Sequence, residues 1–188
     1  MKRMILASGS PRRKELLQML EVPFEVLVSD TKEVITKNEP AEVTKELSYQ
    51  KAMAVAGQVE EGIIIGADTV VSIDGKILGK PADTEEAREM IYKLQGKSHM
   101  VYTGVTVIAK SGDMVSASSF AEGTKGNGAP MTENEIEAYI STDEPYDKAG
   151  AYGIQGLFGK FIEGIKGDYF NVVGLPIHRL YEELKKFD

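Results

Sequence analysis

The fold is set by residues 4–20, which read MILASGSPRRKELLQML. The apolar run 4–7 predicts a short buried strand. Ser10 is a good N-cap and Pro11 is a good first helical residue, so a helix is expected to begin directly after a tight turn. The sequence therefore opens with a strand, a turn and a helix, which starts the alternation typical of an α/β fold.

The same turn gathers hydroxyl groups and cations. Free backbone N–H groups and the positive end of the helix dipole would face the same spot as Arg12, Arg13 and Lys14. Such a spot attracts phosphate. The chain as a whole has the opposite character, because its 188 residues include 22 Lys and Arg against 29 Asp and Glu. The alternative interpretation is a capped helix with solvated cations, and the turn alone does not decide between the two.

Length, charge and composition restrict the possible functions. With 188 residues and no linker or repeat, residues 1–188 are expected to form a single domain or one two-lobed unit. A net charge of -7 argues against bulk binding of nucleic acid but allows a small phosphorylated ligand. The chain has no cysteine, and none of its apolar stretches approaches the roughly 20 residues of a membrane span. We therefore expect a soluble, cytoplasmic protein without a nucleic-acid or membrane partner.

Further strands and helices are expected along the chain, with a long hairpin interrupting their alternation. The expected strands are 24–28, 63–71, 77–78, 100–109, 114–123 and 161–165. The expected helices are 41–56 after Pro40, 81–94 with Thr84 as its cap, 132–141 with a capping box, and 176–187. Asn171, shortly before the last helix, could cap that helix or bind a ligand, and capping is the preferred interpretation. This order favours an α/β fold with a mixed sheet.

Asp68 lies inside the apolar strand 63–71, within the sequence Gly-Ala-Asp-Thr. Burying a carboxylate without a partner costs several kcal/mol, so Asp68 needs either a bonded partner or a metal ion. The alternative is a buried aspartate that caps a neighbouring turn.

Other polar residues suit a nucleotide, although each also fits an ordinary surface or loop position. Lys80, in the sequence Gly-Lys-Pro, is a mobile point charge suited to phosphate oxygens, and Glu33 and Lys51 are candidates of the same kind. Gln155 lies in the glycine-rich stretch 147–156 and can both donate and accept, as the imide edge of uracil or thymine requires. Two histidines, His99 and His178, have no spacing that indicates a nucleophilic triad or a zinc site.

In this order, six motifs resemble those of the Maf family of nucleotide pyrophosphatases. They are SGSPRRK (8–14), GADT (66–69), GKP (79–81), SHMVYTGV (98–105), DKAGAYGIQG (147–156) and NVVGLP (171–176). The resemblance spans nearly the whole chain. It implies an inosine-triphosphatase-like α/β fold, with a mixed bent sheet, flanking helices and two lobes around a cleft.

The resemblance also implies an activity. Members of the family hydrolyse nucleoside triphosphates between the α and β phosphorus atoms, with a divalent cation, Mg²⁺ or Mn²⁺. The branch with Arg12, Thr69 and Gln155 at the matching positions looks like the one that acts on dTTP and UTP, and possible modified forms of them. Asp68 matches the proton acceptor. A homodimer and a link to the arrest of septum formation are further expectations from the family.

These residues together define a hypothetical site. Cations would hold the triphosphate, carboxylates would hold the metal, hydroxyls would donate to phosphate, and two side chains would read the base. The catalytic set is Glu33, Lys51, Asp68 and Lys80; the substrate-binding set is Ser8, Ser10, Arg12, Arg13, Thr69 and Gln155; the metal ligands are Glu33 and Asp68. The rival hypothesis is a non-catalytic regulator of septum formation that only binds the nucleotide.

Overall fold

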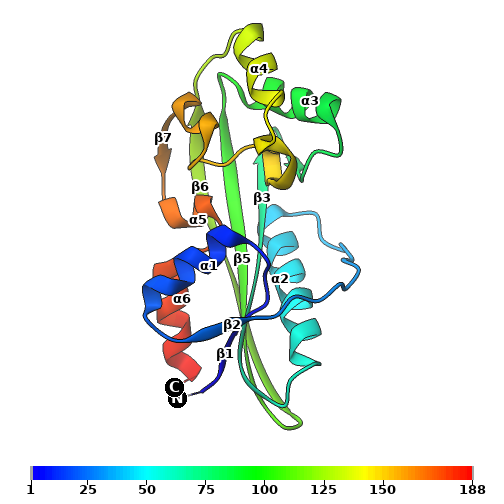
Figure 1. Ribbon diagram of the computed structural model, residues 1–188, viewed down its shortest axis with the longest axis vertical. Coiled ribbons are helices and arrows are strands. Elements are labelled where there is room, and N and C mark those ends of the chain that lie inside the picture. The colour runs from blue at the N-terminus through cyan, green and yellow to red at the C-terminus, as the bar shows by residue number, and fades with distance from the viewer. Residues whose placement is uncertain (1, 188) are drawn as a thin grey trace. The chain divides into compact units, whose positions relative to one another are not determined.

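The computed structural model describes residues 2–187, and these divide into two compact units (Figure 1). The first unit consists of residues 2–68, 103–122 and 174–187, and the second of residues 69–102 and 123–173. The division falls within the long strand that carries Asp68, so that Asp68 belongs to the first unit and Thr69 to the second.

Over the described residues the strands form one seven-stranded sheet, in the order β2-β1-β3-β5-β6-β7, with β4 paired to β3. The strands are β1 (Met4–Leu6), β2 (Phe24–Val26), β3 (Glu61–Ile73), β4 (Lys76–Leu78), β5 (Ser98–Ser111), β6 (Met114–Gly128) and β7 (Ile162–Lys166). β1 is parallel to β2 and β3, whereas β4 is antiparallel to β3 and β7 is antiparallel to β6. The predicted mixed sheet is therefore confirmed.

The helices confirm most of the local signals in the sequence. They are α1 (Pro11–Leu17), α2 (Pro40–Ala56), α3 (Thr84–Leu94), α4 (Glu133–Ile140), α5 (Tyr169–Val173) and α6 (Ile177–Leu184). Short 3-10 helices occupy Gln18–Leu20, Glu144–Asp147, Ala149–Ala151, Leu157–Phe161 and Lys185–Phe187.

Two capping predictions are confirmed and two are wrong. Ser10 caps α1, and Thr132 forms the predicted capping box with Glu135. The cap of α3 is Asp83, whose side chain accepts from the Glu86 N–H, so Thr84 is the first helical residue instead. Asn171 lies buried within α5, where its side-chain amide donates to the Val101 carbonyl.

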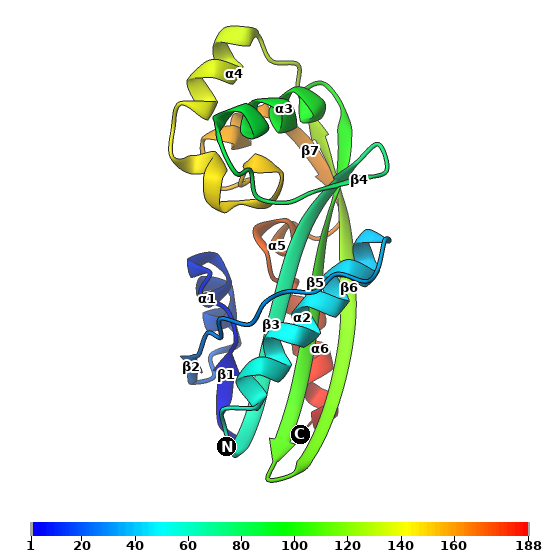
Figure 2. The same ribbon diagram turned by 90° about the vertical axis from the view of Figure 1, so that its right-hand side faces the viewer.

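In the first unit, helices cover both sides of the sheet. Figures 1 and 2 show α2 on one side of β3 and β5 and α6 on the other. The apolar face of α2 packs on β1, β3 and β5, where Val55, Ile64 and Ile108 are fully buried. On the other side, Arg179 of α6 contacts Phe120 of β6, with 4.6 Å between its guanidinium carbon and the centroid of the phenylalanine ring. This packing fixes the strand that carries Asp68 relative to α2.

The second unit has its own apolar core, in which α3 and α4 pack together with the 3-10 helices. Phe158 is fully buried there, with ring centroids 5.1 Å from Tyr139, 4.8 Å from Tyr152 and 5.5 Å from Phe161. On the surface, Arg88 of α3 forms a two-point ion pair with Glu137 of α4. The second unit is therefore stabilised by aromatic packing around residues of the stretch 147–156.

None of the helices between residues 2 and 187 combines the length and the apolar character that a membrane span requires. The mixed α/β fold with flanking helices is confirmed. The expectation that residues 1–188 act as a single domain, with a cleft between two lobes, stays a prediction.

Candidate functional site

The turn before α1 is a network of hydroxyl groups around one arginine. Ser10 Oγ accepts from the Arg13 N–H at 3.4 Å. Ser8 is buried, and its Oγ accepts from the Ser10 N–H at 3.3 Å and from Arg13 Nη1 at 3.2 Å. Arg13 Nε donates to the Gly174 carbonyl at 2.8 Å. The predicted residues Ser8, Ser10 and Arg13 are thus brought together.

Arg12 and Arg13 are both half-buried at the start of α1, which concentrates positive charge at this turn. Burial lowers the pKa of the Arg13 guanidinium, and the attraction of Asp68 acts in the opposite direction. The charge of Asp68 therefore reaches the basic turn, as the hypothesis of a common site requires.

Asp68 on β3 is 8% exposed and uses its two carboxylate oxygens differently. Oδ1 accepts from Lys51 Nζ at 2.6 Å. Oδ2 is buried and has no hydrogen-bond partner within residues 2–187. Asp68 therefore pairs with a helix side chain and does not cap a turn. An unpaired buried carboxylate oxygen is costly, so this oxygen calls for a ligand.

Lys51 on α2 connects the two predicted acids. Besides its bond to Asp68, Lys51 Nζ lies 3.2 Å from Glu33 Oε1. Glu33 is on the exposed segment between β2 and α2, whereas Asp68 is on a buried strand. The first unit thus brings together three of the four predicted catalytic residues, Glu33, Lys51 and Asp68.

Two glycines that the sequence interpretation missed hold α2 close to the sheet. A Cβ at Gly66 would lie 2.4 Å from the Ser48 carbonyl oxygen, and a Cβ at Gly104 would lie 2.2 Å from the Thr44 carbonyl carbon. Ser48 also bonds to Thr106 on β5, with 2.8 Å between the two hydroxyl oxygens. Because Gly66 is two residues before Asp68, this close approach sets the position of Lys51 beside the carboxylate. A glycine within an apolar strand was the available signal.

The donor set of Glu33 and Asp68 suits a hard divalent cation. The unpartnered Asp68 Oδ2 and the exposed Glu33 carboxylate are oxygen ligands of the kind that Mg²⁺ prefers. In the described part of the chain, no group of three or more His, Cys, Asp and Glu side chains is arranged to hold a metal. A cation here would take its remaining ligands from water and substrate phosphates, as Mg²⁺ commonly does.

The other predicted residues, Thr69, Lys80 and Gln155, belong to the second unit. Thr69 is half-buried, and Lys80 and Gln155 are exposed. The Gly150 N–H donates to the Gly79 carbonyl at 3.0 Å, which joins the loop of Lys80 to the stretch that contains Gln155. Gly150 has φ of 69°, and a Cβ there would lie 2.7 Å from a Val71 methyl group. The joint action of these residues with the first unit stays a prediction.

A buried pair in the second unit, His99 and Tyr152, was also missed as a feature. His99 Nε2 and the Tyr152 hydroxyl oxygen are 2.5 Å apart. Burial lowers the pKa of His99 to about 4 and raises the pKa of Tyr152. A neutral imidazole therefore fixes the tyrosine of the stretch 147–156.

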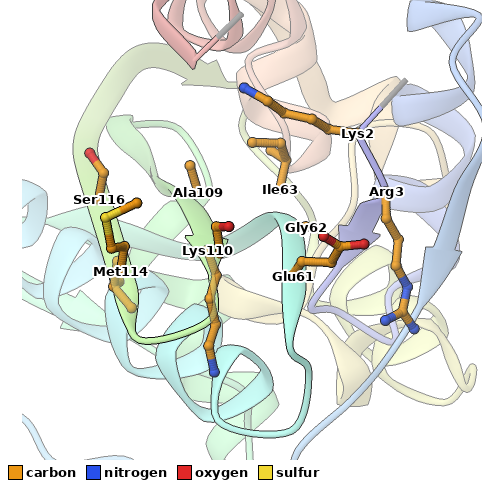
Figure 3. A pocket seen from close by; sticks show the side chains of 11 residues that line it. Lys2, Arg3, Glu61, Gly62, Ile63, Ala109, Lys110, Met114 and Ser116 are labelled. Carbon is orange, nitrogen blue, oxygen red and sulfur yellow. The ribbon is translucent and has the colours of Figure 1, made fainter.

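A cavity of about 790 Å³ in the first unit lies elsewhere, between the start of β3 and the turn that joins β5 to β6. Its cations already have acceptors in the chain: Lys2 bonds to the Phe187 carbonyl, Arg3 pairs with Glu25, and Lys110 Nζ donates to the Ala56 carbonyl at 2.7 Å. Figure 3 shows these side chains around the cavity with Glu61. None of the predicted site residues lines it.

The chain is similar in sequence and in fold to known proteins. A sequence model described as "Maf-like protein" matches residues 3–187. A protein named dTTP/UTP pyrophosphatase from Bacillus cytotoxicus is 53% identical over 189 residues, covering 100% of this chain and 97% of that protein. Its namesake from Bacillus cereus is 50% identical with the same coverage. Among solved structures, the Staphylococcus aureus Ham1 protein matches with a TM-score of 0.55 and 14% identity, covering 100% of both chains. The last similarity concerns the fold alone.

Proposed function

Because the chain belongs to the family of Maf-like proteins, we propose that it is a nucleoside triphosphate pyrophosphatase acting on dTTP and UTP. The products are the nucleoside monophosphate and pyrophosphate. The names of relatives about half identical over the full length support this substrate class. The proposal is carried by the environment of the Asp68 carboxylate. One of its oxygens accepts a hydrogen bond from Lys51, and the other is buried without a hydrogen-bond partner among the described residues.

Cations and hydroxyls of the basic turn are suited to the triphosphate. A triphosphate carries about four negative charges, and each opposite charge at 4 Å contributes roughly 4 kcal/mol at an effective dielectric of 20. Arg12 and Arg13 would supply positive charge from the first unit, and Lys80 from the second. Ser8 Oγ serves as acceptor in both of its bonds, so its own hydrogen is available to a phosphate oxygen. Ser10 would donate in the same way.

Glu33 and Asp68 would hold Mg²⁺ or Mn²⁺. When bound, the ion would neutralise developing charge on the phosphate oxygens. Asp68 would accept a proton from the attacking water. The water oxygen then bonds to the α phosphorus, the bond from that phosphorus to the bridging oxygen breaks, and the electron pair leaves with pyrophosphate. Lys51 orients the Asp68 carboxylate for this step.

Base recognition is assigned to Thr69 and Gln155. An amide side chain can donate and accept at once, which matches the N–H and C=O groups shared by uracil and thymine. Gln155 is exposed, so its amide is accessible to a ligand.

The test is pyrophosphate release from dTTP, UTP, CTP, GTP, ATP and methylated pyrimidine triphosphates, with Mg²⁺ or with Mn²⁺. Asp68→Asn is expected to lose about a thousandfold in rate, within the usual range for general acid and base catalysis. Asp113→Asn, at the exposed turn between β5 and β6, is the matched control. Tight nucleotide binding by the wild-type protein without turnover would support the rival regulator of septum formation. A preference for purines would contradict the roles of Arg12, Thr69 and Gln155.

A further inference from the structure

Glu33 lies on a segment that has little structure of its own. Residues 27–38 form neither helix nor strand, and residues 31–39 are exposed. The two large apolar side chains that follow Glu33 do not anchor it, since Val34 is 55% exposed and Ile35 is 59% exposed. Something other than apolar burial must hold Glu33 near Lys51.

Gln50 of α2 supplies a two-point contact to this segment. The Val34 N–H donates to Gln50 Oε1 at 3.0 Å, and Gln50 Nε2 donates to the Val34 carbonyl at 2.7 Å. One amide side chain thus pairs with both backbone groups of one residue, as a neighbouring strand would. Val34 directly follows Glu33, and Gln50 directly precedes Lys51. The pairing therefore sets the two partners of the 3.2 Å ion pair beside each other.

Glu46, one helical turn before Gln50, supplies a second contact. Its carboxylate accepts from the Thr36 N–H at 2.9 Å and also from the Thr36 hydroxyl. These bonds lower the pKa of Glu46.

The spacing of the two contacts matches on both sides. Residues 46 and 50 are about 6 Å apart along a helix at 1.5 Å per residue. Residues 34 and 36 are about 6.6 Å apart in an extended chain at 3.3 Å per residue. Four hydrogen bonds therefore connect residues 34–36 to one face of α2 in register.

We propose that Gln50 and Glu46 are positioning residues, which hold Glu33 beside Lys51 and Asp68 and so set the affinity of the site for its divalent cation. The inference rests on the proposed function, because it takes Glu33 as a ligand of that cation. The role belongs to two α2 side chains that bond to residues 34 and 36.

The first experiment compares Gln50→Ala with Gln58→Ala. Gln58 follows the same helix and is exposed, and its side-chain amide donates to the nearby Ala54 carbonyl at 3.3 Å. Mn²⁺ binding is titrated by electron paramagnetic resonance with the α,β-imido analogue of dTTP. Loss of two hydrogen bonds is expected to weaken Mn²⁺ binding by about tenfold in Gln50→Ala. The rate at saturating Mn²⁺ should stay within about threefold, and Gln58→Ala should match the wild type.

Hydrogen exchange adds a readout that is independent of metal and activity. The Val34 amide should lose protection in Gln50→Ala and the Thr36 amide in Glu46→Ala, because each loses its acceptor. Unchanged protection of both amides would overturn the inference.

A double-mutant cycle with Glu33→Gln tests whether Gln50 changes the Mn²⁺ affinity through Glu33. If Gln50 acts through Glu33, Gln50→Ala adds no further loss of Mn²⁺ affinity in the Glu33→Gln background. Additive losses would contradict the inference. Should Gln50→Ala fail to fold, Gln50→Glu takes its place, since it keeps the side-chain volume but sets an acceptor against the Val34 carbonyl.

The proposed function and the positioning role of Gln50 are refuted by different results. Full pyrophosphate release by Asp68→Asn would refute the proposed function. Loss of activity in Asp68→Asn, together with unchanged Mn²⁺ binding in Gln50→Ala, would refute only the positioning role of Gln50.

Discussion

Asp68 in the first unit and His99 in the second are both buried polar residues on long strands, 8% and 3% exposed. One side-chain atom of each residue forms a hydrogen bond, Asp68 Oδ1 with Lys51 and His99 Nε2 with Tyr152. Each also has a second buried atom without a hydrogen-bond partner in residues 2–187, Asp68 Oδ2 and His99 Nδ1.

The two residues differ in the charge of their surroundings. Asp68 faces a lysine and is attracted to Arg13, whereas His99 faces a tyrosine hydroxyl and is kept neutral by burial. Burial without a countercharge favours the uncharged form, while a site for an ion needs charge. An unpartnered buried atom therefore points to an ion only where charged groups converge on it.

The largest effect is expected when the charge of Asp68 is removed. Asp68→Asn should reduce pyrophosphate release from dTTP about a thousandfold, or about 4 kcal/mol in the activation barrier. His99→Gln should reduce it less than about tenfold, because the neutral imidazole acts on structure. Similar losses in the two variants would remove the distinction between the two residues.

A smaller effect is expected when α2 is displaced from the sheet. Gly66→Ala would place a Cβ against backbone atoms of α2 and should lower the free energy of unfolding by about 3 kcal/mol. Gly164→Ala on β7 is the control, because a Cβ there meets nothing within 4 Å. Urea unfolding measures both, and equal midpoints would show that the close approach at Gly66 is not required.

The free energy of unfolding should depend on pH through the protonation of His99. Its pKa is about 4 in the folded protein and near 6.5 when unfolded. Between pH 4 and pH 6.5, His99 therefore binds more protons in the unfolded state than in the folded state. Above pH 6.5 His99 is neutral in both states, and its contribution to stability is fully present. The free energy of unfolding should decrease by up to about 3 kcal/mol as pH falls from 6.5 to 4. His99→Gln should flatten this slope and His178→Gln, at an exposed position, should preserve it; the reverse result would assign the slope elsewhere.

The smallest effect is expected at the exposed end of the stretch that Tyr152 anchors. Gln155→Glu replaces a donor by an acceptor and should lower kcat/KM for dTTP and UTP by about tenfold, the cost of one lost hydrogen bond to the base. Rates with CTP provide the internal comparison. An unchanged preference for dTTP and UTP would count against base recognition by Gln155.

Local features of the fold could be predicted from the sequence. The cap at Ser10, the capping box at Thr132 and the start of α2 at Pro40 depend on neighbours within a few residues. The cap of α3 was misplaced by one residue, since Asp83 and Thr84 are both good caps. Asn171 was misread because its partners, Val101 and Thr124, are distant in sequence.

The candidate site was predicted as a set of residues, with roles taken from the family resemblance. Its geometry could not be predicted in the same way. The pairing of Lys51 with both Glu33 and Asp68 depends on how closely α2 approaches β3, and a glycine in a strand does not identify the helix that it admits. The bonds from Gln50 to Val34 have no signature in the local sequence, because each residue alone is ordinary.

The lysine that contacts both acids has a consequence for ligand entry. Its ammonium group is a resident counterion, which allows two like-charged groups to lie near each other before any ligand arrives. With Lys51 between them the two carboxylates lie close together without a bound ion, so the cation of the proposed function would meet two oxygen ligands that are already in place. Its arrival should then be limited by the release of its own water shell rather than by the ordering of a loop.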